Sequence, residues 1–240
     1  WFAIFMALLS AICAYELAKM AQSWGDDPLI PLAMIISVGL SFTIPLIQDS
    51  PPYNKILPPC LAVLSITSLL WLISRGNRRE TCSKYLVSIA VGIFIGGSIS
   101  HALLLRSISQ GLEWTLFVMI VTFSMDTGAF IIGKTIGSKP FAITISPSKT
   151  WEGATAGFLI AITVSIVAGQ LLSLNLPMWH SLMIGALTGI VGQLGDLSES
   201  KLKRIAGIKD SGKLLAGHGG LMDRVDSIIF NVIVVYYLVL

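Results

Sequence analysis

The chain has 240 residues, of which 54% are hydrophobic and only 12% are charged. With a mean hydropathy of +0.81, this composition excludes a water-soluble globular protein, because so few charged side chains could not cover its surface. A formal net charge of only +3 also argues against a nucleic-acid-binding protein, which concentrates positive charge on one face. The composition therefore predicts an all-α integral membrane protein that crosses the bilayer several times.

Long apolar runs follow one another along the chain, and a membrane-spanning helix needs about 20 such residues. They predict eight spans, and a ninth that precedes Trp1, because the first run already starts at the first residue. Asn175-Leu176-Pro177 marks the turn between two helices inside one long uncharged run. The expected spans are, in order, 1–15, 28–47, 56–74, 85–105, 114–133, two helices within 153–195, and 225–240.

Lysine and arginine residues indicate the orientation of these spans, because cytoplasmic loops of membrane proteins are enriched in both. With eight spans, fourteen of the sixteen fall on one side, and only Lys55 and Arg106 fall on the other. We therefore expect the two longest polar loops, 134–150 and 197–224, to face the cytoplasm. The expected organisation is a set of N-terminal transmembrane helices, 1–111, and a catalytic transmembrane region, 112–240, with a polar active-site cavity on the cytoplasmic side.

The segment 195–226 is unusually rich in charge, with four Asp, one Glu, six basic residues, one His and six Gly in 32 positions. If the preceding helix continues into it, its polar residues at i, i+4 and i+7 share one face. Carboxylates at i and i+3 near the start of the last helix also share a face. Such carboxylates suit Mg²⁺, and the basic residues suit phosphate oxygens. The residues in question are Asp196, Ser200, Lys203, Asp223 and Asp226, together with His218 between glycines. The alternative is that these are ordinary charges at the membrane border.

The second loop places three hydroxyls and an ammonium group directly before a predicted helix. Ser146, Ser148, Lys149 and Thr150 could bind an anion there, because helix N-termini present free N–H groups. The alternative, equally open, is a plain helix cap with Ser148 or Thr150 as the N-cap, and one residue can do both.

One carboxylate falls inside an apolar run, where an ionisable group is costly and by default suggests function, and another directly follows the first run. Asp126 lies well inside the fifth run, and the alternative is a structural partner of a buried Lys, Ser or Thr. Glu16 is a weaker candidate, because it lies near the end of the first span and could reach the interface. The small-residue series Gly92, Gly96, Gly97 and Ser100 indicates helix packing rather than catalysis.

The segment 195–226 resembles the signature of phosphatidate cytidylyltransferases, also called CDP-diacylglycerol synthases. Four of its motifs fall at the spacing of that family: Ser200-Lys-Leu-Lys-Arg, Lys209-Asp-Ser-Gly, His218-Gly-Gly and Asp223-Arg-Val-Asp226. An upstream motif is similar as well: Asp126-Thr-Gly-Ala-Phe, Gly133-Lys and Ser146-Pro-Ser-Lys-Thr-Trp-Glu-Gly153. The chain departs from the family pattern at Ala216, where Pro, Gly or Ser is usual, and at Ser198, where a bulkier residue is common.

The resemblance implies a nucleotidyltransferase that converts CTP and phosphatidic acid into CDP-diacylglycerol and pyrophosphate. The acceptor is already an anionic phosphate monoester, so the reaction needs alignment and charge neutralisation rather than a strong base. The resemblance further implies Mg²⁺ held by Asp196 and Asp223, with Asp226 supporting it or a second cation. It also suggests a homodimer among membrane lipid. The compact size and the lack of soluble extensions lead us to expect a bacterial cell (inner) membrane, and the Lys and Arg distribution leads us to expect an active site that faces the cytoplasm.

The remaining roles are also implied by the resemblance. Four basic residues would neutralise the triphosphate and the lipid phosphate: Lys203, Arg204, Lys209 and Arg224. Asp210 would orient a basic partner or hold the second metal, and His218 would donate a hydrogen bond to a phosphate. The substrate-binding set would comprise Asp126, Ser146, Ser148, Lys149, Thr150 and Ser200, with Asp126 facing the cavity from the membrane.

Two other functions remain open from the residues. A CTP-dependent polyprenol or phytol kinase would also need a metal, CTP and a membrane site, but its alcohol acceptor would require a general base. A secondary anion transporter would explain Asp126 and the basic loops, but it predicts inverted repeats and broken helices near the midplane. The charged clusters lie at one face, and no such repeat is visible in the sequence.

Overall fold

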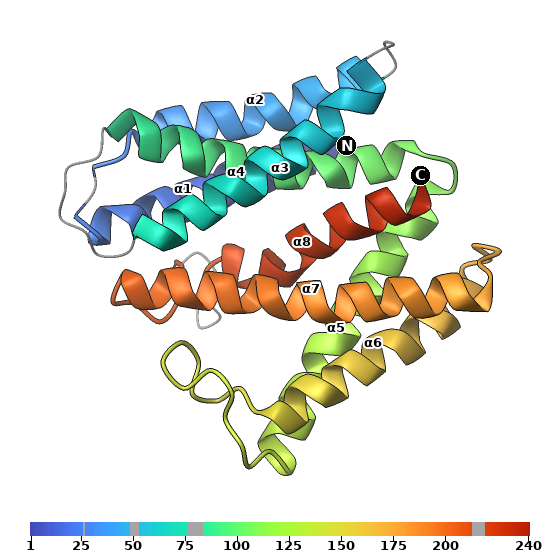
Figure 1. Cartoon of the computed structure of the whole chain (residues 1–240). Helices are drawn as coiled ribbons and strands as arrows, with labels where there is room; N and C mark the ends of the chain where they lie inside the picture. Colours follow the sequence, from blue (N-terminus) through green and yellow to red (C-terminus); the bar gives the residue numbers. More distant parts are fainter. Residues whose placement is uncertain (26, 49–52, 76–83, 213–218) are drawn as a thin grey trace. The chain divides into compact units, whose positions relative to one another are not determined.

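The computed structural model describes residues 1–25, 27–48, 53–75, 84–212 and 219–240. These residues form eight α-helices and no strand, which confirms the all-α prediction (Figure 1). In chain order the helices are α1 (Phe2–Ser23), α2 (Ile30–Gln48), α3 (Tyr53–Arg75), α4 (Lys84–Ser107), α5 (Gly111–Thr135), α6 (Trp151–Leu171), α7 (Met178–Ile205) and α8 (Met222–Val239).

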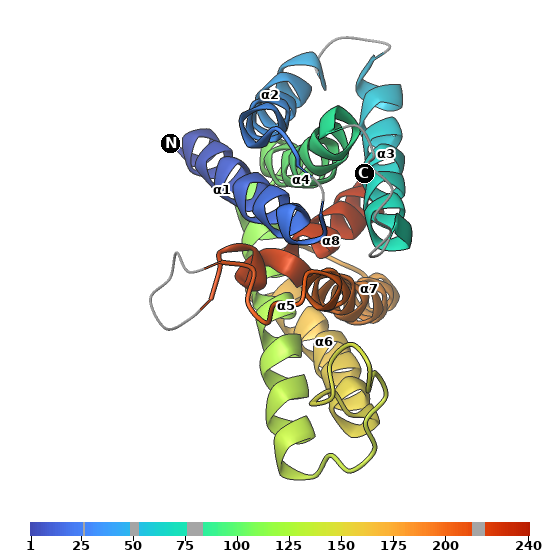
Figure 2. The ribbon, with the colours of Figure 1, turned by 90° about the vertical axis from the view of Figure 1, so that its left-hand side faces the viewer.

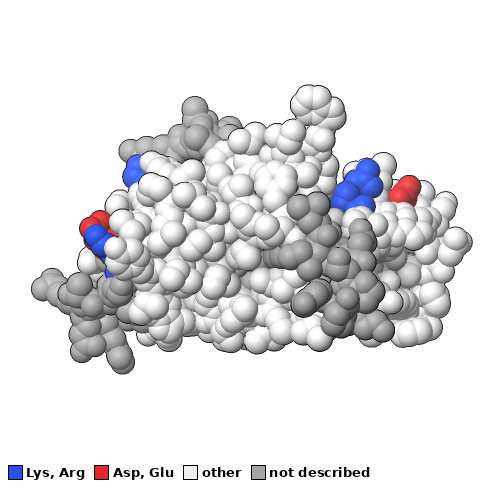
Figure 3. Space-filling view, turned by 90° about the horizontal axis from the view of Figure 1, so that it is seen from above, with Lys and Arg blue, Asp and Glu red and all other residues white. Residues whose placement is uncertain are grey.

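Five of the described helices are long and apolar enough to cross a membrane, namely α1, α3, α4, α5 and α6. Large apolar side chains such as Phe5, Phe130 and Leu159 are 60–65% exposed, which would be unfavourable in water over so many positions. The face drawn in Figure 3 carries few Lys, Arg, Asp or Glu side chains outside the residues drawn in grey. The structure therefore agrees with a polytopic membrane protein, while the count of eight spans stays a prediction.

The helix ends follow local sequence. α6 ends at Leu171 and α7 begins at Met178, and Asn175 in the expected turn has φ of +50°. α7 continues well past its apolar part, to Ile205, because residues 197–205 contain no Gly or Pro and several strong helix formers. The expected common face of Asp196, Ser200 and Lys203 therefore lies on a real helix.

The structure divides into two compact units, and the first comprises residues 1–107 and 201–225. Its helices α1 to α4 pack against one another (Figure 2). Gly96 allows α4 to approach α2 closely, since a Cβ atom there would lie 2.7 Å from the Ser37 Cα atom. The prediction that the small-residue series serves helix packing is confirmed. A buried hydroxyl contact, Ser41 to Ser10 at 3.1 Å, joins α2 to α1.

The second unit comprises residues 108–200 and 226–240. Within it, α5 packs along α6, and Gly153 allows the approach, because a Cβ atom there would lie 2.7 Å from the Ala129 carbonyl oxygen. Asn231 of α8 donates a hydrogen bond to Thr122 of α5 at 2.9 Å. The unit boundary at 107/108 lies close to the expected division after residue 111, but the segment 201–225 belongs to the first unit.

Candidate active site

A cavity of about 510 Å³ lies within the second unit, a volume typical of small-molecule sites. Its wall is formed by α5, the loop 136–150, the start of α6 and the middle of α7. Six residues singled out from the sequence line it: Asp126, Ser146, Ser148, Lys149, Thr150 and Asp196. Three motifs that lie far apart in the sequence therefore meet on one cavity.

An ion pair joins the loop to α7 across this cavity. The Lys149 Nζ atom lies 2.6 Å from the Asp196 Oδ2 atom, and their side chains are 22% and 34% exposed. The Lys149 Nζ atom is itself buried, so Asp196 supplies the negative charge that offsets a buried ammonium group. The pair therefore matters for the site: an entering anion can take over the ammonium group, which leaves carboxylate oxygens of Asp196 for a cation.

The loop before α6 is folded back onto the start of that helix. Glu152 accepts hydrogen bonds from the Ser138 hydroxyl at 2.6 Å and from the Lys139 backbone N–H at 3.2 Å. The Lys139 carbonyl accepts from the Trp151 N–H at 2.9 Å, and the Lys149 carbonyl accepts from the Phe141 N–H at 3.1 Å. These contacts fix the backbone that presents the Ser-Pro-Ser-Lys stretch to the cavity.

Thr150 is the N-cap of α6, and its hydroxyl oxygen accepts the Gly153 N–H at 3.1 Å. The cap interpretation is confirmed, and because the residue also lines the cavity, an anion-binding role stays a prediction. We expect Thr150→Val to lower the free energy of unfolding by about 1 kcal/mol, the usual value of such a cap. Thermal melting in detergent measures this, with Thr150→Ser, which keeps the hydroxyl, as the matched control. A Thr150→Val protein that melts with the wild type would show that the cap contributes nothing.

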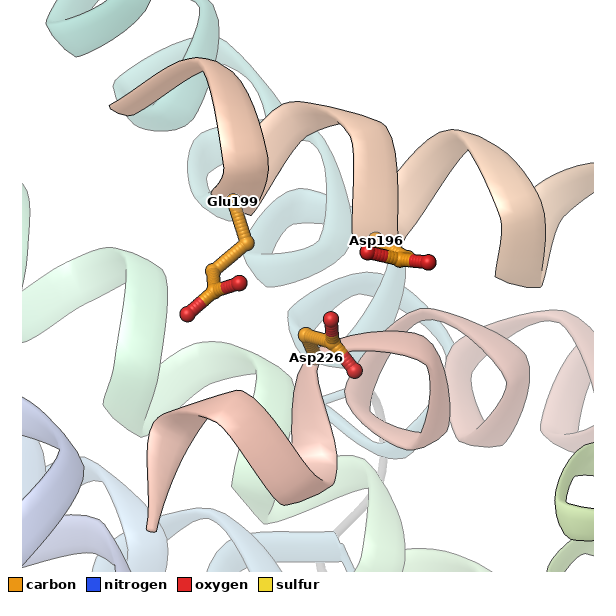
Figure 4. Close-up of side chains that lie close together, drawn as sticks. All are labelled: Asp196, Glu199 and Asp226. Carbon is orange, nitrogen blue, oxygen red and sulfur yellow. The ribbon is translucent and has the colours of Figure 1, made fainter. Parts of the chain in front are cut away.

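A cluster of three carboxylates lies at the junction of α7 and α8 within this unit (Figure 4). One oxygen from each of Asp196, Glu199 and Asp226 lies within 4.8 Å of the others. Glu199 is 2% exposed and Asp226 is 9% exposed. Buried carboxylates this close repel one another, and hard oxygen ligands suit a divalent cation, so the donor set fits a metal such as Mg²⁺. The Ser200 hydroxyl donates to Asp196 Oδ1 at 3.4 Å.

Glu199 is the site residue that sequence reasoning did not single out. It stands three positions after Asp196 on α7, so helical spacing places both on one face. That spacing was available from the sequence, once the helix was known to continue past the apolar run. Asp126, by contrast, was singled out, and here it accepts a hydrogen bond from the Ser227 hydroxyl at 3.4 Å. It therefore has the hydroxyl partner of the structural interpretation and also lines the cavity.

The other predicted catalytic residues belong to the first unit. The Lys203 Nζ atom lies 2.7 Å from Asp223 Oδ1, and the Asp223 carboxylate also accepts the Ser211 N–H at 3.0 Å and the Gly220 N–H at 2.8 Å. Its role as a metal ligand stays a prediction. Lys209 and Asp210 line a second cavity, of about 880 Å³. Arg204 and Arg224 are exposed, and His218 lies outside the described residues.

The helices are able to span a membrane, and the cavity combines a lysine, hydroxyls and two aspartates, one of which belongs to the carboxylate cluster. Both features fit the class of integral membrane enzymes that act on phosphate groups. The sequence matches the cytidylyltransferase family over residues 1–240, and the chain belongs to this family. The resemblance seen in the motifs is thereby confirmed.

Curated relatives of this chain are named phosphatidate cytidylyltransferases. The chain is 33% identical to the phosphatidate cytidylyltransferase of Staphylococcus saprophyticus, over 95% of this chain and 86% of the relative. It is 32% identical to that of Staphylococcus aureus, over 95% and 85% of the two chains. Identity to the Bacillus subtilis enzyme of the same name is 38%, over 61% and 55% of the two chains.

Proposed function

We propose that this protein is a phosphatidate cytidylyltransferase, a nucleotidyltransferase that forms CDP-diacylglycerol and pyrophosphate from CTP and phosphatidic acid. The observation that carries the proposal is the cavity on which Lys149, three hydroxyl residues and Asp196 meet beside the carboxylate cluster. The family membership and the names of the relatives support the same reaction. They do not favour the lipid-alcohol kinase or the anion transporter.

In this reaction an oxygen of the lipid phosphate attacks the α-phosphorus of CTP. A new P–O bond forms as the bond from the α-phosphorus to the bridging oxygen breaks, and pyrophosphate leaves with that electron pair. The nucleophile is an anion already, so no side chain has to remove a proton from it. The protein must align two anions and neutralise their charge.

The chain offers side chains for each of these tasks. Lys149 would bind a phosphate oxygen at the N-terminus of α6, where free N–H groups also favour anions, assisted by Ser146, Ser148 and Thr150. Asp126 would face the substrates from α5, and Ser200 would hold Asp196 in place. Four further basic residues would neutralise the phosphates: Lys203, Arg204, Lys209 and Arg224. Asp210 would orient one of these basic side chains.

Carboxylates would hold the metal ion that such transfers use. Asp196 and Asp226, with Glu199 beside them, supply a compact set of oxygen donors, and we retain Asp223 as a further ligand or as part of a site for a second cation. When bound, Mg²⁺ would offset the negative charge of the phosphate groups. The acidic residues would thus place the positive charge of the ion on the side of the cavity that Lys149 faces.

We further propose that the enzyme works as a homodimer in a bacterial cell (inner) membrane, with its active site facing the cytoplasm. The bias of fourteen among sixteen basic residues supports this orientation. CTP is a cytosolic substrate, whereas phosphatidic acid keeps its phosphate at the interface and its tails in lipid. A site at the cytoplasmic border serves both substrates.

Purified protein in detergent tests the reaction with labelled CTP, phosphatidic acid and Mg²⁺. We expect CDP-diacylglycerol and pyrophosphate in equal amounts, and no product when EDTA removes the metal, since the charges would be left unneutralised. Restoration of product by added Mg²⁺ is the control. Phosphorylation of an added lipid alcohol, with none of phosphatidic acid converted, would instead establish the kinase, and no reaction with either would favour the transporter.

A further inference from the structure

Glu16 in α1 is a buried carboxylate of the first unit. It contacts the segment before and at the start of α8, by which we mean residues 209–212 and 219–223. Its side chain is only 3% exposed. Glu16 Oε1 accepts the Leu221 N–H at 3.0 Å, and Oε2 accepts the Met222 N–H at 2.8 Å. Oε2 also accepts the Ser211 hydroxyl at 3.3 Å. The side chain does not reach for the interface, as its position in the sequence suggested, but turns inward.

These contacts explain how a carboxylate can be buried here. A buried charge is costly unless it is hydrogen-bonded, and bonds to a carboxylate are among the stronger ones. The N–H groups of Leu221 and Met222 stand at the start of α8, where a helix has no backbone acceptors of its own and favours negative charge. Glu16 therefore caps α8 from a different helix, across about two hundred residues of sequence.

Two glycines bring the backbone of this segment against the carboxylate. A Cβ atom on Gly212 would lie 2.9 Å from the Glu16 Cδ atom, and one on Gly220 would lie 2.7 Å from both carboxylate oxygens. Larger residues at either position would push the segment away. The close contact therefore requires glycine at positions 212 and 220, next to the Glu16 carboxylate.

The same segment also binds Asp223. Ser211 gives its hydroxyl to Glu16 and its backbone N–H to Asp223, and Gly220, which packs on Glu16, donates its N–H to Asp223 at 2.8 Å. Asp223 in turn pairs with Lys203. A displacement of the segment from Glu16 would therefore also remove the donors that orient Asp223 and, through it, Lys203.

Glu16 lines the cavity of about 880 Å³ together with Lys209 and Asp210, but both of its carboxylate oxygens are taken up by donors of the segment. We propose that Glu16 is therefore a positioning residue, which holds the segment carrying Lys209, Asp210 and Asp223 in its working arrangement. This proposal rests on the proposed function for the roles of those three residues. Loss of Glu16 leaves their charges in place, so substrates still bind. It removes the alignment of those charges, so the effect falls on kcat rather than on KM.

The test compares Glu16→Gln and Glu16→Asp with Glu113→Gln, a control that makes the same carboxylate-to-amide exchange in the first turn of α5, outside the lining of both cavities. In Glu16→Gln the amide NH₂ group meets N–H donors in place of an acceptor oxygen. We expect kcat to fall about tenfold or more, with both KM values within about threefold of wild type. Glu16→Asp keeps the charge and should recover part of the loss, while Glu113→Gln should match wild type.

Hydrogen–deuterium exchange supplies a readout that does not depend on activity. Exchange should rise in peptides covering 209–212 and 219–223 and stay unchanged in α2 and α4. Because Glu16→Gln could fail to fold, Ser211→Ala is measured beside it; it removes one donor from the segment side and should give the same local rise with a smaller loss of kcat.

Wild-type kcat and exchange in Glu16→Gln would overturn the proposal. So would a loss of kcat accompanied by faster exchange throughout α1 to α4, which would show a merely structural role. If the wild-type protein makes no CDP-diacylglycerol, the proposed function fails. The exchange data then decide alone whether Glu16 holds the segment.

Discussion

Asp196→Asn should reduce CDP-diacylglycerol synthesis by about 1,000-fold or more, because Asp196 belongs both to the cavity that contains Lys149 and to the carboxylate cluster. Its carboxylate pairs with Lys149 and belongs to the cluster with Glu199 and Asp226. Asparagine keeps the shape but loses the charge and one acceptor oxygen, so it cannot serve a cation and an ammonium group together. Initial rates with labelled CTP at saturating substrates measure the loss.

The fold should survive this change, because the loss of one negative charge also relieves the repulsion among three carboxylates that lie within 4.8 Å of one another. Glu113→Gln is the matched control, since it makes the same carboxylate-to-amide exchange in the first turn of α5. We expect that variant to keep wild-type activity and both variants to melt within a few degrees of wild type. An Asp196→Asn protein with more than about a tenth of wild-type activity would contradict the metal assignment, given what loss of such a group costs.

The helices could largely be predicted from the sequence, because uninterrupted apolar runs and the turn at Asn175 mark them directly. Hydropathy could not show that α7 continues to Ile205, since that part of the helix is charged. Helix propensity and the absence of Gly and Pro in residues 197–205 do indicate that the helix continues. The continuing helix that places Ser200 and Lys203 on the face of Asp196 also places Glu199 there, three positions after Asp196.

Residues of the candidate site could be predicted where their neighbours in the sequence make them unusual. Lys149 follows hydroxyls before a helix, and Asp126 stands among apolar residues, so both could be singled out from neighbouring residues alone. Glu16 was only a weaker candidate, and its role could not be predicted, because its donors lie 195 to 206 positions away. Its burial and its hydrogen bonds are created by tertiary packing, and one sequence contains no periodic signal for them.

The loop lysine provides the second large expected effect. Lys149→Met should lower kcat/KM for CTP by about 100-fold, because methionine retains much of the side-chain length but cannot neutralise a phosphate oxygen at the N-terminus of α6. The hydroxyls of Ser146, Ser148 and Thr150 remain in place, so the loss is smaller than that expected for Asp196→Asn. Rates over a range of CTP concentrations at fixed phosphatidic acid measure it.

Lys139→Met is the matched control, because Lys139 lies in the same loop, is exposed and contributes backbone atoms to the loop's hydrogen bonds. If Lys149 and Asp196 act on the same phosphate group and its cation, the double variant should lose much less than the product of the two single losses. Equal activity of Lys149→Met and Lys139→Met would remove the loop from the catalytic site. Fully multiplicative losses would show that lysine and carboxylate act independently, and their ion pair would then be a feature of the resting enzyme alone.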